Sequence, residues 1–547
     1  MKQTLSMSCW TAMLLISTLG SSSQAQGLTS IETVGELIFF DENLSINRNQ
    51  SCASCHDPDV GWTGPDQEIN AHGAVYEGSV PGLFGNRKPP SSGYATISPI
   101  FNFVRRAGGE FVGGNFWDGR ATGEKLGNPA ADQAQGPFLN PLEQALPDAA
   151  CVVERVCNST GYGDLFQQVF PAACDISFPG DIDTVCSQPI GIVELSDEDR
   201  AKVETAYNDI ALAIAAYEDS SAVNQFTSKY DAFLVGLVEL TPQEERGRQL
   251  FQGKADCARC HTTSPGPNRE PPVFTNFTFA NLGVPKNPEN PFYVMPPEFN
   301  PLGVNWLDVG LGGFLQTKLE YEHLAPDNFG KQKVPSLRNV DKRPFEGFVK
   351  AYGHNGFFKS LKQIVHFYNT RDVLPVCPND FVGTVGETCW PAAEIPANIN
   401  TPELGDLGLT DEEEDAVVAF MTTLSDGFMD VTPPVGEFDV ELDSFKVPAK
   451  ARTGQIRTIV IEVENEGPGL ASGDVSVIGV NAGGSTIAQF MSSFENLEGD
   501  DEVAFSFDWT VPNSATTVTW TATISAEGDV NPANNVNMNT TQVRAKK

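Results

Sequence analysis

The segments SCASCH, residues 51–56, and CARCH, residues 257–261, decide how this chain is built. In each, two cysteines three positions apart are followed at once by a histidine. Two thiols can then form thioethers with the vinyl groups of a haem while an imidazole lies beneath the iron. One such segment alone also fits a metal or redox motif, but two in one chain favour two covalently bound haem c groups. The attachment residues and proximal ligands are Cys52, Cys55, His56, Cys257, Cys260 and His261.

The first residues have the pattern of a secretory signal peptide. Lys2 precedes an apolar stretch, and the small-residue ending Ser23-Gln24-Ala25 predicts cleavage after residue 25. The apolar stretch is shorter than the roughly 20 residues that span a bilayer, and no later segment is long and apolar enough. We therefore expect a periplasmic or otherwise exported protein without a membrane span.

Export would place the remaining cysteines in an oxidising compartment, where thiols form disulfides. Of the eleven cysteines, Cys9 falls in the signal peptide and four belong to the haem segments. Four of the other six lie in the stretch 151–186 and can pair in three ways, while Cys377 and Cys389 bracket a separate loop. We predict three disulfides.

The composition is strongly acidic, with 35 Lys and Arg against 71 Asp and Glu and a formal net charge of −36. Such a balance repels nucleic acid and anionic membranes and favours a cationic partner. The alternative is a solvated acidic surface with no specific partner. Nucleic-acid binding is not expected in either case.

A chain of 547 residues is too long for one hydrophobic core, since domains average roughly 100–200 residues. Residues 26–195 are loop-rich and hold the first haem segment. Residues 196–431 begin with an amphipathic helix over 196–217 and hold the second haem segment. Thr241 and Thr410 are expected to cap two further helices there. We predict a mainly α protein with two class I cytochrome c-like haem domains.

The composition changes after Thr432-Pro433-Pro434. Segments such as IRTIVIEVENEG and TTVTWTATISA alternate apolar and polar residues between Gly, Asn and Pro turns, as strands with one buried face do. Residues 432–547 therefore predict an all-β, immunoglobulin-like sandwich that lacks the cysteine pair of antibody domains. Its strand pattern resembles the CARDB-type adhesion modules of secreted bacterial proteins.

Four further strings accompany the haem segments. They are GELIFFDENLS before the first haem segment, FWDGRA at 116–121, QAQGPFLNPLE at 133–143 and KVPSLRNV at 333–340. Together they resemble the bacterial di-haem cytochrome c peroxidase and MauG family over about residues 30–430. The resemblance implies a reaction with hydrogen peroxide at the first haem and electron transfer through the second.

By this resemblance, Glu143 is the acid and base over the first haem, with Gln133 and Pro137 in the same distal pocket. A carboxylate suits this work because one group must accept a proton from hydrogen peroxide and return it to the departing oxygen. The alternative is structural. Asn140, Pro141 and Glu143 also fit the N-cap, N1 and N3 positions of a helix, which would make Glu143 a capping-box residue.

Two other residues match positions of the family, each with a plain alternative. Trp117 in FWDGRA resembles the tryptophan that relays electrons between the haems, or it is an ordinary core tryptophan. His72 lies sixteen residues after His56, where peroxidases of the family hold a histidine that caps the first haem until reduction. The segment that follows it is Gly-rich and longer than the family's loop, so an exposed loop histidine is the alternative.

The distal ligand of the second haem separates two branches of the family. It lies fourteen residues after the histidine of a His-Asn-Gly turn, here His354, which places it at Tyr368. Peroxidases of the family have methionine there and MauG has tyrosine, an oxyanion donor that favours ferric and higher states. The alternatives are His366 as the ligand, or one buried apolar stripe along a helix over 361–368.

Two positions depart from the family. Members hold a calcium ion between the haems, partly through an asparagine after the arginine that Arg87 resembles, and Lys88 stands there. An ammonium is a poor neighbour for Ca²⁺, although Asn86 or carbonyl oxygens can compensate, which leaves a calcium site open. Ala255 stands where MauG has a surface tryptophan that oxidises its protein substrate, which weakens the expectation of that partnership.

These patterns predict an exported di-haem peroxidase or MauG-like oxidase. It would oxidise a donor through the second haem, either a small electron-transfer protein such as a cytochrome c or cupredoxin, or a residue on a protein substrate. One alternative is a non-catalytic di-haem electron-transfer cytochrome with a binding or adhesion domain. Another is a surface-attached binding protein whose haems are vestigial.

Overall fold

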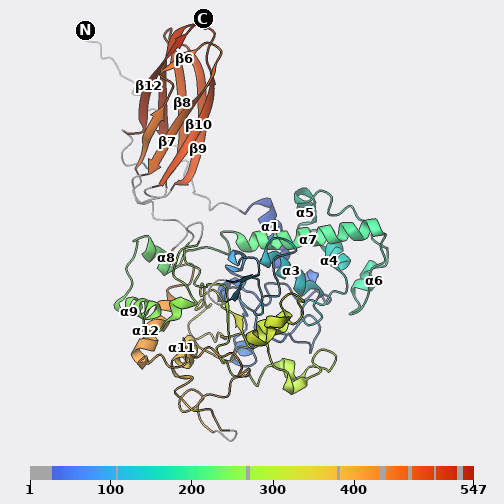
Figure 1. The fold of residues 1–547 in the computed structure, drawn as a ribbon. Helices are drawn as coiled ribbons and strands as arrows, with labels where there is room; N and C mark the ends of the chain where they lie inside the picture. The colour runs from blue at the N-terminus through green and yellow to red at the C-terminus, as the bar shows by residue number, and fades with distance from the viewer. Residues whose placement is uncertain are drawn as a thin grey trace, which may run out of the picture. The chain divides into compact units, whose positions relative to one another are not determined.

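The chain folds into a helical unit and a β unit. The computed structural model describes residues 28–105, 109–266, 271–378, 382–429, 439–465, 471–497, 501–526 and 534–546. The helical unit covers Gln24–Phe428 and the β unit includes Met429–Lys547 (Figure 1). The expected signal peptide, residues 1–25, lies outside the described residues.

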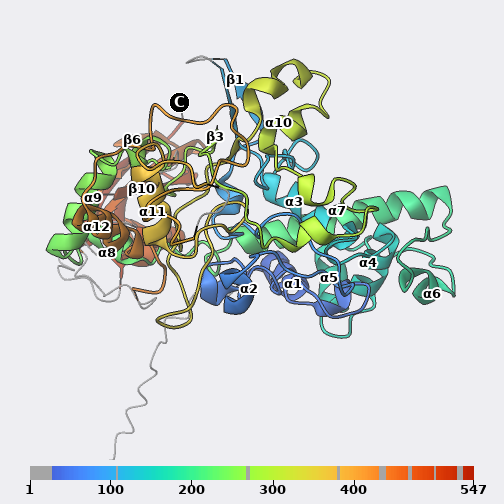
Figure 2. The same cartoon turned by 90° about the horizontal axis from the view of Figure 1, so that it is seen from below.

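The helical unit consists of helices joined by long loops. Its α-helices are α1 (Ser30–Phe39), α2 (Gln67–Ala71), α3 (Pro129–Leu139), α4 (Ala149–Cys157), α5 (Gly163–Val169), α6 (Ile182–Cys186), α7 (Asp197–Asp219), α8 (Lys229–Leu234), α9 (Pro242–Gln252), α10 (Gly310–Leu315), α11 (Leu361–Thr370) and α12 (Asp411–Thr422). Two short antiparallel pairs join β1 (Asn102–Val104) to β2 (Glu110–Val112) and β3 (Phe279–Ala280) to β4 (Gln332–Lys333). Both views show α1, α3, α4, α5 and α7 on one side and α8, α9, α11 and α12 on the other (Figures 1 and 2).

The first core is built from α1, α3, α4, α5 and α7. The amphipathic helix expected over 196–217 is present as α7, but its buried residues belong to this core and not to the second haem unit. The expected boundary at 195/196 therefore falls within the first core, because the helix supplies the apolar face that α1 and α4 need. The disulfides Cys151–Cys186 and Cys157–Cys174 also lie here. With Cys377–Cys389, the prediction of three disulfides is confirmed.

The second core is built from α9, α11 and α12. The two predicted caps are confirmed. Thr241 and Thr410 each accept a hydrogen bond from the backbone N–H of a glutamate three residues on, whose carboxylate bonds back to the cap. Each capping box satisfies two backbone donors that a helix leaves unpaired at its start.

Both haem segments follow a helix that packs against a later helix through a glycine. In α1, a Cβ atom at Gly35 would lie 1.9 Å from the carbonyl oxygen of Ala213 in α7. In α9, a Cβ at Gly247 would lie 1.8 Å from the carbonyl oxygen of Ala416 in α12. An aromatic pair accompanies each contact, with ring centroids 5.6 Å apart for Phe39–Tyr217 and 5.2 Å apart for Phe251–Phe420. The helical unit therefore contains an internal repeat, once per haem segment.

Replacing Gly35 with alanine should destabilise the protein, because the new methyl group overlaps a backbone oxygen that cannot move aside. We expect a loss of roughly 3 kcal/mol, the upper end for overpacking a core. Thermal and denaturant unfolding of the haem-loaded protein measure it. Gly136→Ala in α3 is the control, since its Cβ would lie 3.5 Å from the nearest atom. Equal stability of the two variants would contradict the close contact between α1 and α7.

The β unit consists of two sheets that pack around one core. One sheet has the order β10-β7-β5 and the other β6-β12-β11-β8-β9. The Trp509 and Trp520 rings, one from each sheet, meet at 4.9 Å. The strands are β5 (Val440–Lys446), β6 (Lys450–Arg452), β7 (Ile456–Asn465), β8 (Ala471–Asn481), β9 (Thr486–Leu497), β10 (Asp501–Thr510), β11 (Thr516–Ser525) and β12 (Val536–Arg544). The alternating pattern thus predicted the two-sheet sandwich.

Candidate functional site

Each haem segment lines its own cavity in the helical unit. Cys52, Cys55 and His56 line a first cavity of about 590 Å³. Cys257, Cys260 and His261 line a second cavity of about 200 Å³. None of the four cysteines is in a disulfide, and burial raises the pKa of every one of these thiols. Two thiols and an imidazole on one wall of a largely apolar cavity fit a covalently attached haem c.

The two histidines are oriented by backbone carbonyl oxygens. Nδ1 of His56 lies 3.1 Å from the carbonyl oxygen of Trp62, and Nδ1 of His261 lies 2.8 Å from that of Phe274. A carbonyl only accepts hydrogen bonds, so each Nδ1 carries the proton and each Nε2 keeps its lone pair. Burial lowers the pKa of both imidazoles to about 4. Both rings are therefore neutral and ready to bind iron through Nε2.

The structure brings Gln133, Pro137 and Glu143 together in the first cavity. Gln133 and Pro137 lie one turn apart on α3 and so share a face of the helix. Glu143 follows in a turn that runs close to Gly78, where a Cβ atom would lie 2.5 Å from the carbonyl oxygen of Leu142. No helix starts at Pro141, where the described chain forms a turn, so the capping-box alternative for Glu143 is wrong.

Arg120 is a cavity residue that the sequence analysis missed. Burial raises the pKa of Glu143, and the Arg120 guanidinium opposes that rise. Arg120 stacks 3.8 Å above the ring of Phe116 and pairs with Asp118 at 2.9 Å. Its place in FWDGRA, beside the expected electron relay, was the only signal that could have identified it. The first cavity thus holds a carboxyl group and a nearby fixed cation.

Trp117 lines both cavities. Its indole Nε1 donates a 2.8 Å hydrogen bond to the carbonyl oxygen of Lys88, and its own carbonyl accepts one from the backbone of Lys333 at 2.7 Å. The next residue, Asp118, pairs at 2.6 Å with Arg87, which also binds Asp308 through two nitrogens. These contacts fix the indole on the wall between the two cavities.

The stripe on α11 faces the second cavity. Leu361, Ile364, Val365 and Tyr368 all line it, so the predicted helical periodicity describes a cavity wall. Tyr368 is half-buried there, and desolvation of its hydroxyl raises the pKa of that group. His366 points elsewhere, with Nδ1 2.9 Å from Glu414 and Nε2 2.9 Å from the carbonyl oxygen of Gly386. His366 is therefore not placed to ligate the second haem.

His354, from which Tyr368 was counted, is buried beside Trp117. Their ring centroids lie 6.4 Å apart, and the carbonyl oxygen of His354 accepts a hydrogen bond from the backbone N–H of Lys88. Nε2 of His354 lies 3.8 Å from carboxylate oxygens of both Asp308 and Glu394. The His-Asn-Gly turn thus helps to form the wall that separates the cavities.

His72 lies at the surface and lines neither cavity. Its Nε2 and Nδ1 lie 3.2 and 3.3 Å from carboxylates of Glu68 and Glu289, and its side chain is 58% exposed. These carboxylates raise its pKa. The expectation that His72 caps the first haem is not supported by this position, because both ring nitrogens lie beside exposed carboxylates.

The position where the sequence left a calcium site open carries a buried ammonium group. Lys88 Nζ donates to Thr63 Oγ1 at 2.8 Å and to the carbonyl oxygen of Pro89 at 2.9 Å. Calcium needs oxygen ligands, and a second positive charge beside the ion is unfavourable. Asn86, the expected substitute, accepts at its carbonyl a hydrogen bond from Asn290. The residues present do not fit a calcium ion at Lys88.

The repeated helices place different residues over the two cavities. On α7, Ile214 and Glu218 line the first cavity, and at the matching positions of α12, Val417 and Met421 line the second. Burial raises the pKa of Glu218 to about 8. Ala255, before the second haem segment, is 4% exposed and lines the second cavity. No surface aromatic residue stands at that position.

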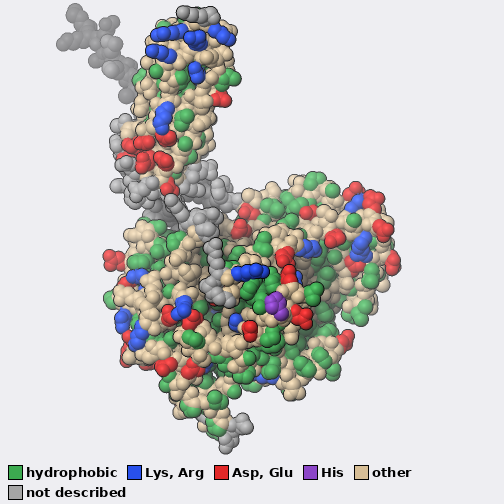
Figure 3. Space-filling view, in the orientation of Figure 1, with side chains coloured by type: hydrophobic (Ala, Val, Ile, Leu, Met, Phe, Trp, Pro, Cys, Tyr) green, Lys and Arg blue, Asp and Glu red, His purple; other side chains and the backbone are tan. Residues whose placement is uncertain are grey.

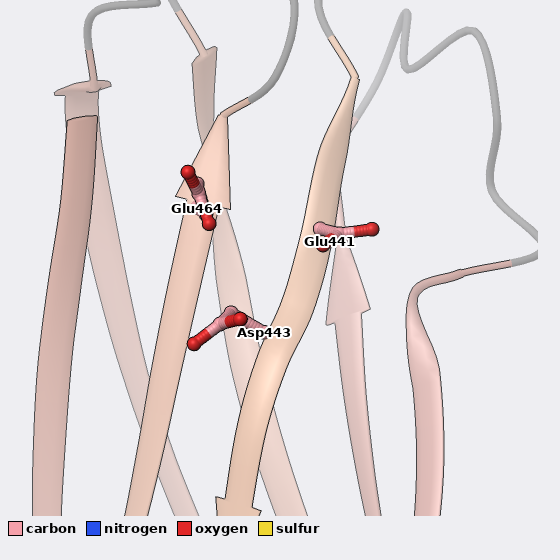
Figure 4. A group of neighbouring side chains, drawn as sticks. All are labelled: Glu441, Asp443 and Glu464. Atoms are coloured by element: carbon pink, nitrogen blue, oxygen red, sulfur yellow. The ribbon is translucent and has the colours of Figure 1, made fainter. Parts of the chain in front are cut away.

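Charged side chains occur on the described surface of both units. On the face shown in Figure 3, acidic and basic side chains are interspersed over the helical unit. In the β unit, Glu441 and Asp443 of β5 and Glu464 of β7 bring carboxylate oxygens within 4.8 Å of one another (Figure 4). Asn534 donates to Glu441 and to Asp439. These carboxylates alone do not identify a metal site.

Hydropathy does not identify a transmembrane helix. Among the described residues, none of the helices combines the length and apolar character needed to cross a bilayer.

Comparisons with known proteins agree with the presence of two haem segments in this chain. Residues 30–239 match the family model described as di-haem cytochrome c peroxidase. The methylamine utilization protein MauG of Paracoccus denitrificans is 34% identical over 415 residues, which cover 76% of this chain and 93% of that protein. The cytochrome-c peroxidase IdrP2 of Denitromonas iodatirespirans is 25% identical over 75% of this chain and 85% of its own length.

Solved structures resemble both parts of the chain. The diheme peroxidase BthA from Burkholderia thailandensis is 28% identical, covers 74% of this chain and 88% of its own, and has a TM-score of 0.55. The CARDB domain of the PF1109 protein from Pyrococcus furiosus is 21% identical, covers 22% of this chain and 97% of its own, and has a TM-score of 0.16. We draw no functional conclusion from the second likeness.

Proposed function

The chain belongs to the di-haem cytochrome c peroxidase and MauG family, and from that membership we propose how its two cavities divide the work. It is a di-haem peroxidase-type oxidase that uses haem c, a peroxide substrate and a redox partner. We assign the peroxide reaction to the first cavity and donor oxidation to the second. The observation that carries this division is the meeting of Gln133 and Glu143 with the Cys52–His56 segment in the larger cavity.

Glu143 moves the proton in the first cavity. The haem, when bound, supplies the iron at which the O–O bond is broken. Glu143, as carboxylate, accepts the proton from one oxygen of hydrogen peroxide and returns it to the other, which leaves as water. Gln133 orients the peroxide by hydrogen bonding, and Pro137 keeps that wall dry and fixed. Arg120 stabilises the carboxylate form between turnovers.

Trp117 connects the two cavities for electrons. Its indole lies on the wall that both cavities share, so an electron can pass through it from the second site to the first. The group beside Nε1 is the backbone carbonyl of Lys88, which cannot take up a proton at that oxygen. The indole therefore keeps its proton while it relays charge.

Tyr368 ligates the second haem and tilts the enzyme towards the MauG branch. A tyrosine oxygen favours the ferric and higher states that a MauG-like oxidase stores. The donor is a small cationic electron-transfer protein, such as a cytochrome c or cupredoxin, or a residue on a protein substrate. Since Ala255 is buried and not aromatic, transfer to a protein substrate would not use the surface tryptophan of MauG.

The architecture supports three further assignments. The repeated helix pair before each haem segment supports two cytochrome c-like haem domains. Three disulfides support an exported, oxidising location such as the periplasm. Every residue that lines the two cavities belongs to the helical unit, so we assign the CARDB-like β unit to docking or adhesion.

Mixing the ferric, haem-loaded protein with one equivalent of hydrogen peroxide tests the proposed function. We expect a rapid change in the haem absorption spectrum, followed by its reversal when a reduced small cytochrome c is added and becomes oxidised. An unchanged spectrum would contradict the peroxidase assignment. It would favour the alternative of a di-haem electron-transfer cytochrome with both irons fully ligated.

A further inference from the structure

Two lysines, Lys88 buried and Lys333 half-buried, lie on the wall between the haem cavities. Lys88 and Lys333 each line both cavities. Nζ of Lys333 donates to Ser98 Oγ and Asn115 Oδ1, both at 2.8 Å, and to the carbonyl oxygen of Gly114. Lys88 is 7% exposed, and its Nζ donates only to a hydroxyl and a carbonyl oxygen among its described neighbours. Both ammonium groups are held in place by neutral acceptors.

Neither lysine has a carboxylate partner in the part of the chain that the structure describes. The contrast with Arg87, next to Lys88, is sharp, because Arg87 is paired with Asp118 and Asp308. Burial lowers the pKa of both Lys88 and Lys333 to about 7. A buried ammonium without a counter-charge is costly, so such groups are normally paired with an anion. Two of them on one cavity wall indicate an anionic ligand.

The haems themselves bring the missing anions. A haem c carries two propionate carboxylates on the edge opposite its two thioether bonds. Cys52 and Cys55 line only the first cavity and Cys257 and Cys260 only the second, whereas Lys88 and Lys333 line both, so each lysine would be available to a propionate in either cavity. We propose that Lys88 and Lys333 are the counter-cations of the haem propionates between the two sites. The inference rests on haem attachment and is independent of the peroxide mechanism.

The ammonium groups of Lys88 and Lys333 on the shared wall also take the place of a bound divalent ion. Calcium between the haems would supply positive charge to the same region, but Lys88 offers an ammonium where an oxygen ligand is needed. The lysines supply that charge from the chain itself. The haem-loaded protein therefore needs no calcium for its resting spectra or its redox potentials.

Redox titration of the resting protein, without peroxide, tests the proposal. Lys88→Met and Lys333→Met should each shift the midpoint potentials of both haems downward, because loss of a nearby positive charge favours ferric iron. Lys88→Arg, which keeps the positive charge, should have the midpoint potentials of the wild-type protein. Lys125→Met, which removes an exposed lysine bonded to Gln135, is the matched control. Potentials in both methionine variants equal to those of the control would overturn the assignment.

Two measurements on the wild-type protein keep the proposal testable if the variants load haem poorly. The propionate bending bands in resonance Raman spectra should show charged hydrogen-bond partners, and bands typical of solvated propionates would overturn the assignment. Calorimetric titration of the EDTA-treated holoprotein with CaCl₂ should show no binding and no change in the haem spectra. Stoichiometric calcium binding that shifts both haem spectra would contradict the replacement of the ion by Lys88.

Discussion

Replacing Glu143 with glutamine will lower kcat/KM for hydrogen peroxide by roughly 10²–10⁴-fold, the range for a lost general acid–base group. Glutamine keeps the size and hydrogen bonding of the side chain but cannot take up the peroxide proton. The haem content and resting spectrum should stay unchanged, since Glu143 touches neither the thioether cysteines nor a proximal histidine in our assignment. Stopped-flow mixing with peroxide measures the loss directly.

The pH profile separates a catalytic Glu143 from a merely structural one. Because the carboxylate form acts as the base, kcat/KM should rise with pH through a pKa that burial has raised above the usual carboxyl range. Glu143→Gln should remove this rise. The control is Glu154→Gln in α4, whose carboxylate lies outside both cavities and bonds to Asn158. A variant with full activity and an unchanged profile would show that another group moves the proton.

Spacing in the sequence predicted the site where the chemistry is local. The two Cys-x-x-Cys-His segments, Gln133 to Glu143, and the α11 stripe all lie on single elements or short turns, so their spacing fixes which face they share. The capping alternative for Glu143 failed because α3 ends at Leu139 and the next residues form a turn. The residues Asn140 to Glu143 are compatible with a helix start and with a turn, so the local sequence alone did not decide between them.

Long-range packing is what the sequence did not show. The assignment of α7 to the first core depends on its contact with Gly35 of α1, which is far away in the chain. Arg338 of KVPSLRNV likewise is fully buried in an ion pair with Asp231, so that part of the motif is structural. His72 matched a family spacing, but its side chain lies at the surface beside Glu68. The spacing of residues along the chain does not show which residues from distant segments a loop side chain will contact.

The internal repeat sharpens the difference between the two sites. Equivalent helix positions carry Glu218 over the first cavity and Met421 over the second. The first cavity therefore combines the carboxyl groups of the half-buried Glu143 and the buried Glu218 with the larger volume, which suits proton transfer to a small polar substrate. The second is smaller and lined mainly by apolar side chains and Tyr368, which suits a fully ligated iron that stores charge.

Replacing Tyr368 with phenylalanine will change the coordination of the second haem while leaving the first unchanged. In the absence of a cation, burial raises the pKa of the Tyr368 hydroxyl, so a bound metal is needed to stabilise the phenolate. Loss of this anionic donor should raise the midpoint potential of the second haem. Donor oxidation should fall by at least tenfold, because the site then no longer favours the higher oxidation states. Electron paramagnetic resonance of the ferric protein follows the ligand change.

Two variants in the same cavity decide how that result is to be interpreted. Tyr352→Phe also removes a hydroxyl from a buried tyrosine of this cavity and should leave the second haem unchanged. Met421→Leu removes the thioether that α12 places in this cavity. If Tyr368 is the ligand, this variant should also leave the spectrum of the second haem unchanged. A response to Met421→Leu together with an unchanged spectrum in Tyr368→Phe would make the ligand a thioether. The second haem would then have the higher potential of the peroxidase branch, and the MauG-like assignment would be wrong.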